Sequence, residues 1–337
     1  MQVLSGTPDA PGVTRLAPSP TGALHLGNAL SFLLTWALAR RLGWSVVLRI
    51  EDLETPRTKA WAAQQAIDDL RWLGLDWDEG PLTQAGDLEP YRAAMDRLAW
   101  AGLVYPCTLS RREIEAAASA PNEGDHELRF GPELRPAERP PRFDDAGTNW
   151  RLAVDPGAVP FRDALLDAHG PVARDPSLSV GDFVVWTKGG QPSYQLAATV
   201  DDARQGVDRI VRGDDLLDSG ARQALLRGHL GLSPEPIHLH HPLVRGADGR
   251  RLAKRHGDTR LASLRDLGVP AERVVGLVAW WLGATPRRGE LAARHLPERL
   301  GPDSIGSLNG IRANADGGGV TFGEEDLTWL IDPSAGA

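Results

Sequence analysis

Short and long apolar runs alternate over the first part of the chain. A short run near residue 13 leads into a turn rich in proline and glycine, and a long apolar segment then covers residues 29–42 and stops at Gly43. The next run, residues 45–50, is short and rich in valine and isoleucine, as buried strands are. This alternation predicts strand, loop, helix and parallel strand, which is the βαβ unit of an α/β fold.

The same kind of pattern predicts further elements downstream. We expect helices over residues 56–73, 90–101, 219–230, 264–268 and 271–282, and strands over 150–154, 183–186, 194–200, 208–211 and 237–244. Residues 116–149 combine many prolines and charges with little periodicity, which predicts an irregular insertion. The glycine run within residues 312–322 predicts a loop.

Composition narrows the class of protein. A chain of 337 residues, 42% of them apolar, can form one large domain and a smaller one. It has neither an apolar run of about 18 residues nor a signal-peptide pattern, so we expect a cytoplasmic protein with no membrane contact. The single cysteine, Cys107, excludes an internal disulfide and a thiolate-rich zinc site within one chain. With a net charge of −8, any contact with nucleic acid must use a local patch, and arginines are the expected residues.

The turn before the long apolar segment has the features of an anion site. Residues 15–28 read RLAPSPTGALHLGN, so a helix that begins near His25 would direct its N–H groups and the positive end of its dipole at a ligand. Gly22 and Gly27 allow close approach to the backbone. Taken alone, such a turn is as often a simple connection, and it matches neither the GxGxxG nor the GxxxxGK[ST] pattern. The simplest anion is a nucleotide phosphate.

Four motifs in order give this turn a family context. PSPTGALHLGN, RIED, IVRGDDLLDS and RLAKRH resemble, with plausible separations, the motifs of class I aminoacyl-tRNA synthetases of the glutamyl type, over residues 13–283. The resemblance implies an α/β fold with a Rossmann-like parallel sheet, an inserted subdomain that resembles an acceptor-binding one, and a short helical C-terminal region. The divisions expected are 1–103 and 181–262 for the two halves of the catalytic domain, 104–180 for the insertion, and 263–337 for the C-terminal region without an anticodon-binding domain.

The resemblance also implies which residues bind glutamate. Glutamate carries two carboxylates and an ammonium group, so its pocket needs cations and an anion, and Arg15 and Arg212 can pair with carboxylates while Glu51 takes the ammonium. Ser19 and Tyr194 add neutral hydrogen bonds. The full set of glutamate positions implied is Arg15, Ala17, Ser19, Glu51, Tyr194 and Arg212. Without the family context, the arginines would be read as ordinary ion pairs and Tyr194 as a core residue.

ATP is the second substrate that the resemblance implies, with Mg²⁺ as its companion ion. His25 and Lys254 are the expected catalytic residues, and Gly27 and Asn28 complete the expected ATP contacts. Activation is in-line attack of a carboxylate on the α-phosphorus, where positioning and charge neutralisation do most of the work. The chain departs from the family pattern at Asn28, and at Arg251 and Ala253 in the second signature, but Lys254 is retained.

The length of chain beyond Lys254 indicates the acceptor. Only 83 residues lie after Lys254, which leaves no room for a large anticodon-binding portion. The chain therefore resembles most the shortened glutamyl paralogues that attach glutamate to the queuosine base in the anticodon of tRNA(Asp). Two alternatives remain: a truncated glutamyl-tRNA synthetase-like enzyme with another acceptor, and a nonenzymatic tRNA-binding paralogue.

Zinc is not expected. Relatives of this type often bind zinc through a Cys-x-Cys pair and a later Tyr-x3-Cys, but here Leu109 takes the second position and Phe130 and Leu134 stand in the later pair. One thiol cannot make a tetrahedral site, so we expect apolar packing there instead. In a strand, His238 and His240 face one side and His241 the other, so a shared metal ion is not favoured.

Overall fold

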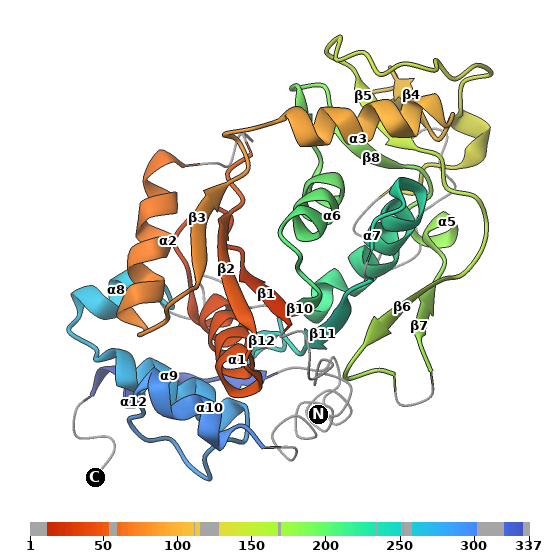
Figure 1. The fold of residues 1–337 in the computed structure, drawn as a ribbon. Helices are drawn as coiled ribbons and strands as arrows, with labels where there is room; N and C mark the ends of the chain where they lie inside the picture. Colours follow the sequence, from red (N-terminus) through yellow and green to blue (C-terminus); the bar gives the residue numbers. More distant parts are fainter. Residues whose placement is uncertain are drawn as a thin grey trace.

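The computed structural model describes most of the chain. The described residues are 12–53, 59–110, 112–114, 128–167, 170–233, 235–250, 252, 258–301 and 320–332. Within them, the molecule has two sets of parallel strands side by side, an antiparallel sheet above one set, and a group of helices beneath the other (Figure 1).

The first set of strands follows the predicted βαβ pattern. The elements are β1 (Val13–Leu16), α1 (Leu26–Leu42), β2 (Ser45–Ile50), α2 (Ala60–Trp72) and β3 (Glu79–Thr83). Strand β2 lies between β1 and β3 and pairs with both in parallel. The helix and strand predicted from residues 29–50 are therefore confirmed, and the helix predicted over 56–73 is confirmed for its described part.

The second set is assembled from distant parts of the chain. It contains β10 (Arg209–Gly213), β11 (Ile237–His241), β6 (Val159–Asp163) and β7 (Val172–Arg174), in the order β10-β11-β6-β7. The first three strands are parallel, with α7 (Leu217–Leu230) as the crossover between β10 and β11, and β7 returns antiparallel to β6.

Strands β1 and β10 join the two sets. The N–H of Asp208 donates to the carbonyl of Val13 at 3.0 Å, and the N–H of Val13 donates to the Asp208 carboxylate at 2.8 Å. Farther along, Nη1 of Arg15 donates to the carbonyl of Val211 at 3.3 Å. The carboxyl ends of β1, β2, β10 and β11 consequently meet at one edge, which is where open α/β sheets bind ligands.

The inserted region forms an antiparallel sheet. Its strands are β4 (Val104–Cys107), β5 (Asn149–Leu152), β8 (Phe183–Thr187) and β9 (Gln191–Pro192), with α3 (Glu89–Trp100) beside them (Figure 1). Strand pairing crosses the expected domain boundary between residues 180 and 181 in both directions. Strands β8 and β9 belong to this sheet. Strands β6 and β7, which precede the boundary, belong to the second set, where β6 pairs with β11 and β7 pairs with β6.

Apolar packing holds the start of the insertion together, as predicted. A buried cluster includes Tyr105, Cys107 and Phe130, with Leu109 and Leu134 packed against it. Between residues 128 and 148 the chain is irregular except for the 3₁₀ turn η1 (Pro132–Leu134), which agrees with the expected irregular insertion for that part.

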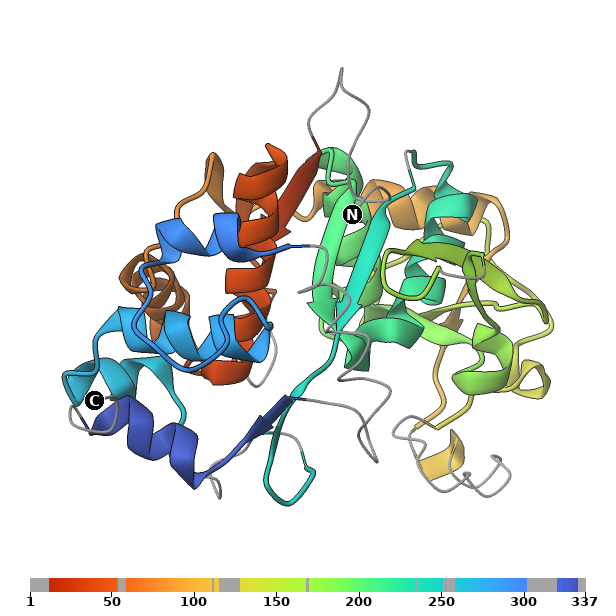
Figure 2. The ribbon, with the colours of Figure 1, turned by 90° about the horizontal axis from the view of Figure 1, so that it is seen from below.

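Helix α1 is the centre of the larger core. Leucines, alanines and aromatic residues cover most of its circumference, so most of the helix must be enclosed. The strands cover one side, and the helices α9 (Ala271–Trp281) and α10 (Leu296–Arg299) cover the other, while α8 (Leu261–Asp266) packs against α2 (Figure 2). Gly43 ends α1 with φ 72°, a left-handed conformation that glycine adopts without strain.

Two of the predicted elements were wrong. Residues 194–200 are not a strand but the start of α6 (Tyr194–Arg204), because Ser193 caps the helix and Leu196, Ala197 and Val200 recur on one buried face at helical spacing. Residues 320–322 are not loop but β13 (Val320–Phe322), which pairs in parallel with β12 (Val244–Gly246). The final described helix is α12 (Glu324–Ile331). Among the described helices, none is long and apolar enough to span a membrane.

Asp69 is an unusual residue of the α2–α8 contact. Its side chain is fully buried, and neither carboxylate oxygen has a hydrogen-bond partner among the described residues. Burial raises the pKa of Asp69 to about 6, although the Arg265 guanidinium, 3.3 Å away, acts in the opposite direction. The protonated form therefore fits the folded protein better than the ionised one.

Asp69 should make stability fall as the pH rises. Its folded-state pKa of about 6 lies above the ordinary value of 3.8, so its contribution is present at low pH and is lost as the pH passes through 6. In urea unfolding, the free energy of unfolding of Asp69→Asn minus that of the wild type should grow by about 2 kcal/mol between about pH 4.5 and about pH 7.5. A difference that stays constant over this range would contradict the assignment.

Candidate active site

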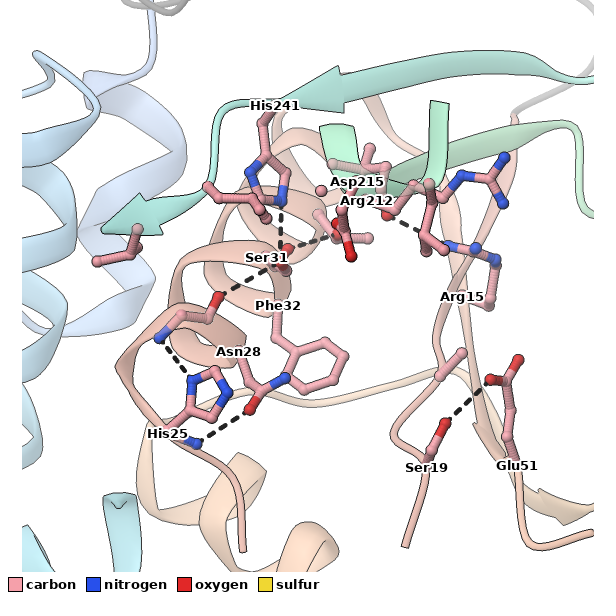
Figure 3. A pocket seen from close by; sticks show the side chains of 18 of the residues that line it. Arg15, Ser19, His25, Asn28, Ser31, Phe32, Glu51, Arg212, Asp215 and His241 are labelled. Atoms are coloured by element: carbon pink, nitrogen blue, oxygen red, sulfur yellow. Dashed lines mark hydrogen bonds between the residues drawn. The ribbon is translucent and has the colours of Figure 1, made fainter. Parts of the chain in front are cut away.

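A pocket of about 800 Å³ opens at the edge where the carboxyl ends of the strands meet (Figure 3). The predicted glutamate and ATP positions that the structure describes all line it: Arg15, Ala17, Ser19, His25, Gly27, Asn28, Glu51, Tyr194 and Arg212. Lys254, together with Arg251 and Ala253, lies outside the described residues. Residues from several elements and separate motifs thus converge on one cavity, while their individual roles stay predictions.

The start of α1 is capped by its own residues. Nδ1 of His25 accepts from the N–H of Gly27 at 3.1 Å, and Oδ1 of Asn28 accepts from the N–H of His25 at 3.0 Å. Because Nδ1 acts as an acceptor, Nε2 is the ring nitrogen that carries the hydrogen. The N–H of Leu26 donates to the carbonyl of Thr259 at 3.0 Å.

These contacts differ from the expected set of open N–H groups. The first N–H groups of α1 already have partners, so an anion here would be met by the His25 ring, the Asn28 amide and the helix dipole. The reason is local: Asn28 is the third residue after His25, which is the spacing of a reciprocal cap.

The chain on both sides of Lys254 is fixed at this site. Upstream, Leu252 lines the pocket, and its N–H lies 3.3 Å from the carbonyl of Val244. Downstream, His25 and Arg260 form an antiparallel β-bridge, and the N–H of Leu261 donates to the carbonyl of Leu24 at 2.9 Å. The described flanks, Leu252 and Arg260, therefore both lie next to the first signature.

Two buried arginines form the cationic wall. Arg15, on β1, and Arg212, on β10, are 6% and 5% exposed. Nε of Arg212 donates to His240 at 2.9 Å and Nη1 donates to Gln223 at 2.8 Å, but Nη2 has no hydrogen-bond partner among the described residues. Burial lowers the pKa of Arg212, with a further contribution from Arg15, whereas Tyr194 and Asp202 oppose the shift. The pair is thus short of negative charge and hydrogen-bond acceptors.

A buried carboxylate sits behind this wall. Asp202, on α6, accepts from Nη1 of Arg49 at 2.8 Å and lies 3.5 Å from Nε of Arg15. Burial alone would raise the pKa of Asp202, but the two guanidiniums hold it below its ordinary value. Nη2 of Arg49 also donates to Glu51 at 3.2 Å. Arg49 therefore links the carboxylate behind the pocket to the carboxylate in it.

Glu51 lines the cavity from the end of β2, the strand that pairs with the β1 of Arg15. It follows β2 directly, and its second oxygen accepts from the Ser19 hydroxyl at 3.3 Å (Figure 3). Ser19 comes from the loop after β1, so the two predicted glutamate positions lie together as anion and hydroxyl. The pocket consequently presents a carboxylate as well as two cations.

Sequence reasoning missed Ser31 and His241 as pocket residues. Nδ1 of His241 donates to the carbonyl of Pro242 at 2.9 Å, so Nε2 is the acceptor of the Ser31 hydroxyl at 2.8 Å. Burial lowers the pKa of His241, which keeps the ring neutral at physiological pH. Helical spacing places Ser31 one turn above Gly27, but only the fold brings β11 beside it.

A second cavity adjoins the first. It measures about 680 Å³ and shares Tyr194, Asp215 and Leu216 with the pocket. Its other wall comes from the inserted sheet and includes Asn149 and Arg151. The two cavities together span the boundary between the parallel strands and the insertion.

The expectations about metal ions stay predictions. His238 and His240 stack on one another at 5.4 Å between ring centroids, while His241 turns to Ser31, which confirms the predicted division of the three histidines between two faces. Within the described ranges, no group of three or more His, Cys, Asp or Glu residues is arranged to hold a metal ion.

Comparison with known proteins identifies the class. Residues 13–293 match the family model described as tRNA synthetases class I (E and Q), catalytic domain. The glutamate-tRNA synthetase of Elizabethkingia anophelis has the same fold, with a TM-score of 0.74 at 21% identity over 95% of this chain and 70% of that chain. The chain belongs to the class I tRNA synthetases and is a ligase of the aminoacyl-tRNA synthetase type.

Two relatives define the branch within that class. A Glutamyl-Q tRNA(Asp) synthetase of Rhodopirellula baltica is 46% identical over 290 residues, covering 81% of this chain and 86% of the relative. A protein of the same name from Symbiobacterium thermophilum is 43% identical over 321 residues, covering 88% of this chain and 98% of the relative. Within the class I enzymes, the chain belongs with the glutamyl-Q tRNA(Asp) synthetases.

The buried Arg49 should matter more for stability than a surface arginine that makes as many side-chain hydrogen bonds. The single ammonium group of a lysine cannot replace the planar guanidinium, whose two terminal nitrogens bond to Asp202, Gln205 and Glu51 together. We expect Arg49→Lys to lower the free energy of unfolding by about 3 kcal/mol in urea denaturation, because it leaves buried charge poorly paired.

Arg40→Lys is the matched control for this substitution. Arg40 bonds to Asp76 and Asp78, but both partners are largely exposed, so the loss should stay below about 1 kcal/mol. Equal losses in the two variants would contradict the importance given to the buried network.

Proposed function

We propose that the protein activates L-glutamate with ATP and transfers the glutamyl group to the queuosine base in the anticodon of tRNA(Asp). The relatives with 43–46% identity carry the name of this activity. The pocket supports the first half of the reaction, and its connection to the second cavity supports the second half.

The arrangement of charges in the pocket supports glutamate as the amino acid substrate. The open Nη2 edge of Arg212, with Arg15 beside it, can pair with a carboxylate of the substrate. Glu51 lines the same pocket and can pair with the ammonium group. A glutamate bound between them satisfies a buried donor that otherwise has no described acceptor, which makes this ligand favourable.

ATP would lie at the start of α1. The α-carboxylate of glutamate attacks the α-phosphorus, an oxygen–phosphorus bond forms, and the bond to the leaving pyrophosphate breaks. Nε2–H of His25 and the Asn28 amide are placed to contact the phosphates at the positive end of the helix dipole. Lys254 would neutralise the leaving pyrophosphate. Mg²⁺ would arrive with ATP, since this ion is usually held by phosphates, water and few carboxylates.

The acceptor base would approach through the second cavity. This cavity meets the pocket at Tyr194 and Asp215, so a nucleoside there lies next to the activated carboxyl group. Its volume of about 680 Å³ is within the range of small-molecule sites. The two alternatives, a 3′-terminal acceptor and a nonenzymatic tRNA-binding role, are separated by experiment.

Glutamate activation should depend on the two predicted catalytic residues. In ATP–pyrophosphate exchange with glutamate and no tRNA, His25→Ala and Lys254→Ala should each lower kcat/KM by about 100-fold or more, because each removes charge stabilisation of the transition state. Lys188→Ala, at an exposed turn outside the pocket, is the control and should keep the wild-type rate. Absence of exchange in the wild type would favour the nonenzymatic reading.

The acceptor can be tested by trimming the tRNA. We expect labelled glutamate to be transferred to tRNA(Asp) that contains queuosine even after its 3′-terminal adenosine is removed. The same tRNA prepared without queuosine should remain unlabelled. Labelling of both tRNAs to the same extent, or loss of labelling on trimming, would refute the proposed acceptor and favour a 3′ terminus.

A further inference from the structure

A buried chain of three side chains holds Arg212 from behind. Nε of Arg212 donates to Nε2 of His240 at 2.9 Å, and Nδ1 of His240 lies 2.6 Å from Oδ2 of Asp163. The residues belong to the neighbouring strands β10, β11 and β6 (Figure 1). His240 and Asp163 are completely buried, and Arg212 is 5% exposed.

Arg212 and Asp163 determine which nitrogen of His240 carries the hydrogen. A guanidinium nitrogen can only donate, so Nε2 of His240 must accept, and the ring hydrogen must be on Nδ1. Asp163 is the acceptor of that hydrogen. Its other oxygen accepts from the N–H groups of Leu165 and Leu166 at 2.9 and 3.1 Å, which fixes the carboxylate. The tautomer of His240 is therefore set by Asp163.

The surroundings keep the ring in one orientation. His238 stacks on His240 with 12° between the ring planes, and Phe161 presents its edge to both rings. Burial holds the pKa of His238 well below its ordinary value, so the stacked ring adds no charge. Nη1 of Arg212 is fixed separately by Gln223 at 2.8 Å. Two of the three guanidinium nitrogens are thus held, and Nη2 remains for a ligand in the pocket.

The chemistry of the middle residue is the informative point. A carboxylate at position 240 would also hold Arg212, but it would cancel the positive charge that a substrate carboxylate needs. A neutral imidazole accepts the same hydrogen bond and keeps the anionic partner, Asp163, one ring farther away. The arrangement combines a rigid guanidinium with an available charge.

We propose that Asp163 and His240 are positioning residues for substrate recognition, and that they fix Arg212 with its Nη2 edge and its charge directed at a carboxylate of the amino acid substrate. This inference rests on the proposed function, because it assumes that Arg212 binds glutamate.

The tautomer supplies the test. Oδ1 of Asp163 accepts from the N–H groups of Leu165 and Leu166, and Oδ2 accepts from both the ring and the backbone N–H of His240. In Asp163→Asn, an amide that keeps its oxygen on the two leucine N–H groups turns its NH₂ group toward Nδ1 of His240. The ring hydrogen then moves to Nε2 and opposes the N–H of Arg212. We expect KM for glutamate in ATP–pyrophosphate exchange to rise about 10-fold or more, with KM for ATP unchanged. His240→Leu, which removes the acceptor, should have the same effect.

Three variants separate an effect on the position of Arg212 from an effect on folding. His240→Gln retains a neutral acceptor for Arg212 and should restore KM for glutamate to within a few-fold of the wild type. In this background, Asp163→Asn should have little further effect, because glutamine has no tautomer for Asp163 to set. His238→Gln is the matched control, since His238 shares the stack but makes its described hydrogen bond to the carbonyl of Arg162, and it should leave KM for glutamate unchanged.

The wild-type protein gives an independent readout. Nitrogen-15 NMR of the histidine ring should find His240 with its hydrogen on Nδ1, and a hydrogen on Nε2 would overturn the inference. Wild-type exchange together with an unchanged KM in both Asp163→Asn and His240→Leu would overturn it as well. If the wild type shows no glutamate-dependent exchange while NMR finds the hydrogen of His240 on Nδ1, the proposed function fails, but the hydrogen-bond arrangement of Asp163, His240 and Arg212 is correct.

Discussion

The pocket depends on the pairing of one buried carboxylate, that of Asp202, with two arginines. The carboxylate comes from α6, yet it bonds to Arg49 of β2 and lies against Arg15 of β1. A charge taken out of water in this way is unfavourable unless its partners are close and well oriented. Because Arg49 and Arg15 meet this condition, the helix and the two strands are held in one relative position. That position decides where the walls of the pocket stand.

The polar architecture around the pocket has two layers. The inner layer, Arg15, Arg212 and Glu51, lines the cavity and carries charges of both signs. The outer layer lies behind it and is buried: Asp202 with Arg49 on one side, and His240 with Asp163 on the other. The outer layer gives the inner one its orientation while leaving it charged. Substrate-binding groups held from behind lose less conformational entropy when the substrate arrives.

The sequence indicated the fold where local patterns were long or motifs were specific. The apolar segment of α1 and the strand β2 were predictable from periodicity, and the described candidate residues of three of the four motifs line one pocket. Residues 194–200 were mistaken for a strand because a short apolar run has no distinct period, and Ser193 as a helix cap decides the matter only in the fold.

The features that the sequence did not predict depend on contacts between residues far apart in the chain. Asp163 and His240 are 77 positions apart, and Ser31 and His241 are 210 apart, so no spacing rule connects them. The reciprocal cap of His25 and Asn28 is a local feature, but only the structure shows that it occupies the N–H groups that were expected to bind an anion. Side-chain networks behind a site are therefore the part of function that sequence patterns describe least.

The seam between β1 and β10 has a thermodynamic consequence. Arg15 belongs to the first strand set and Arg212 to the second, and the two sets meet at this seam. A ligand that contacts both arginines acts as a reversible cross-link between distant segments of the chain. By mass action, a ligand at about 100 times its dissociation constant adds about 2.7 kcal/mol to the free energy of unfolding. An amino acid substrate bound as proposed, in contact with both arginines, would thus also stabilise the tertiary structure.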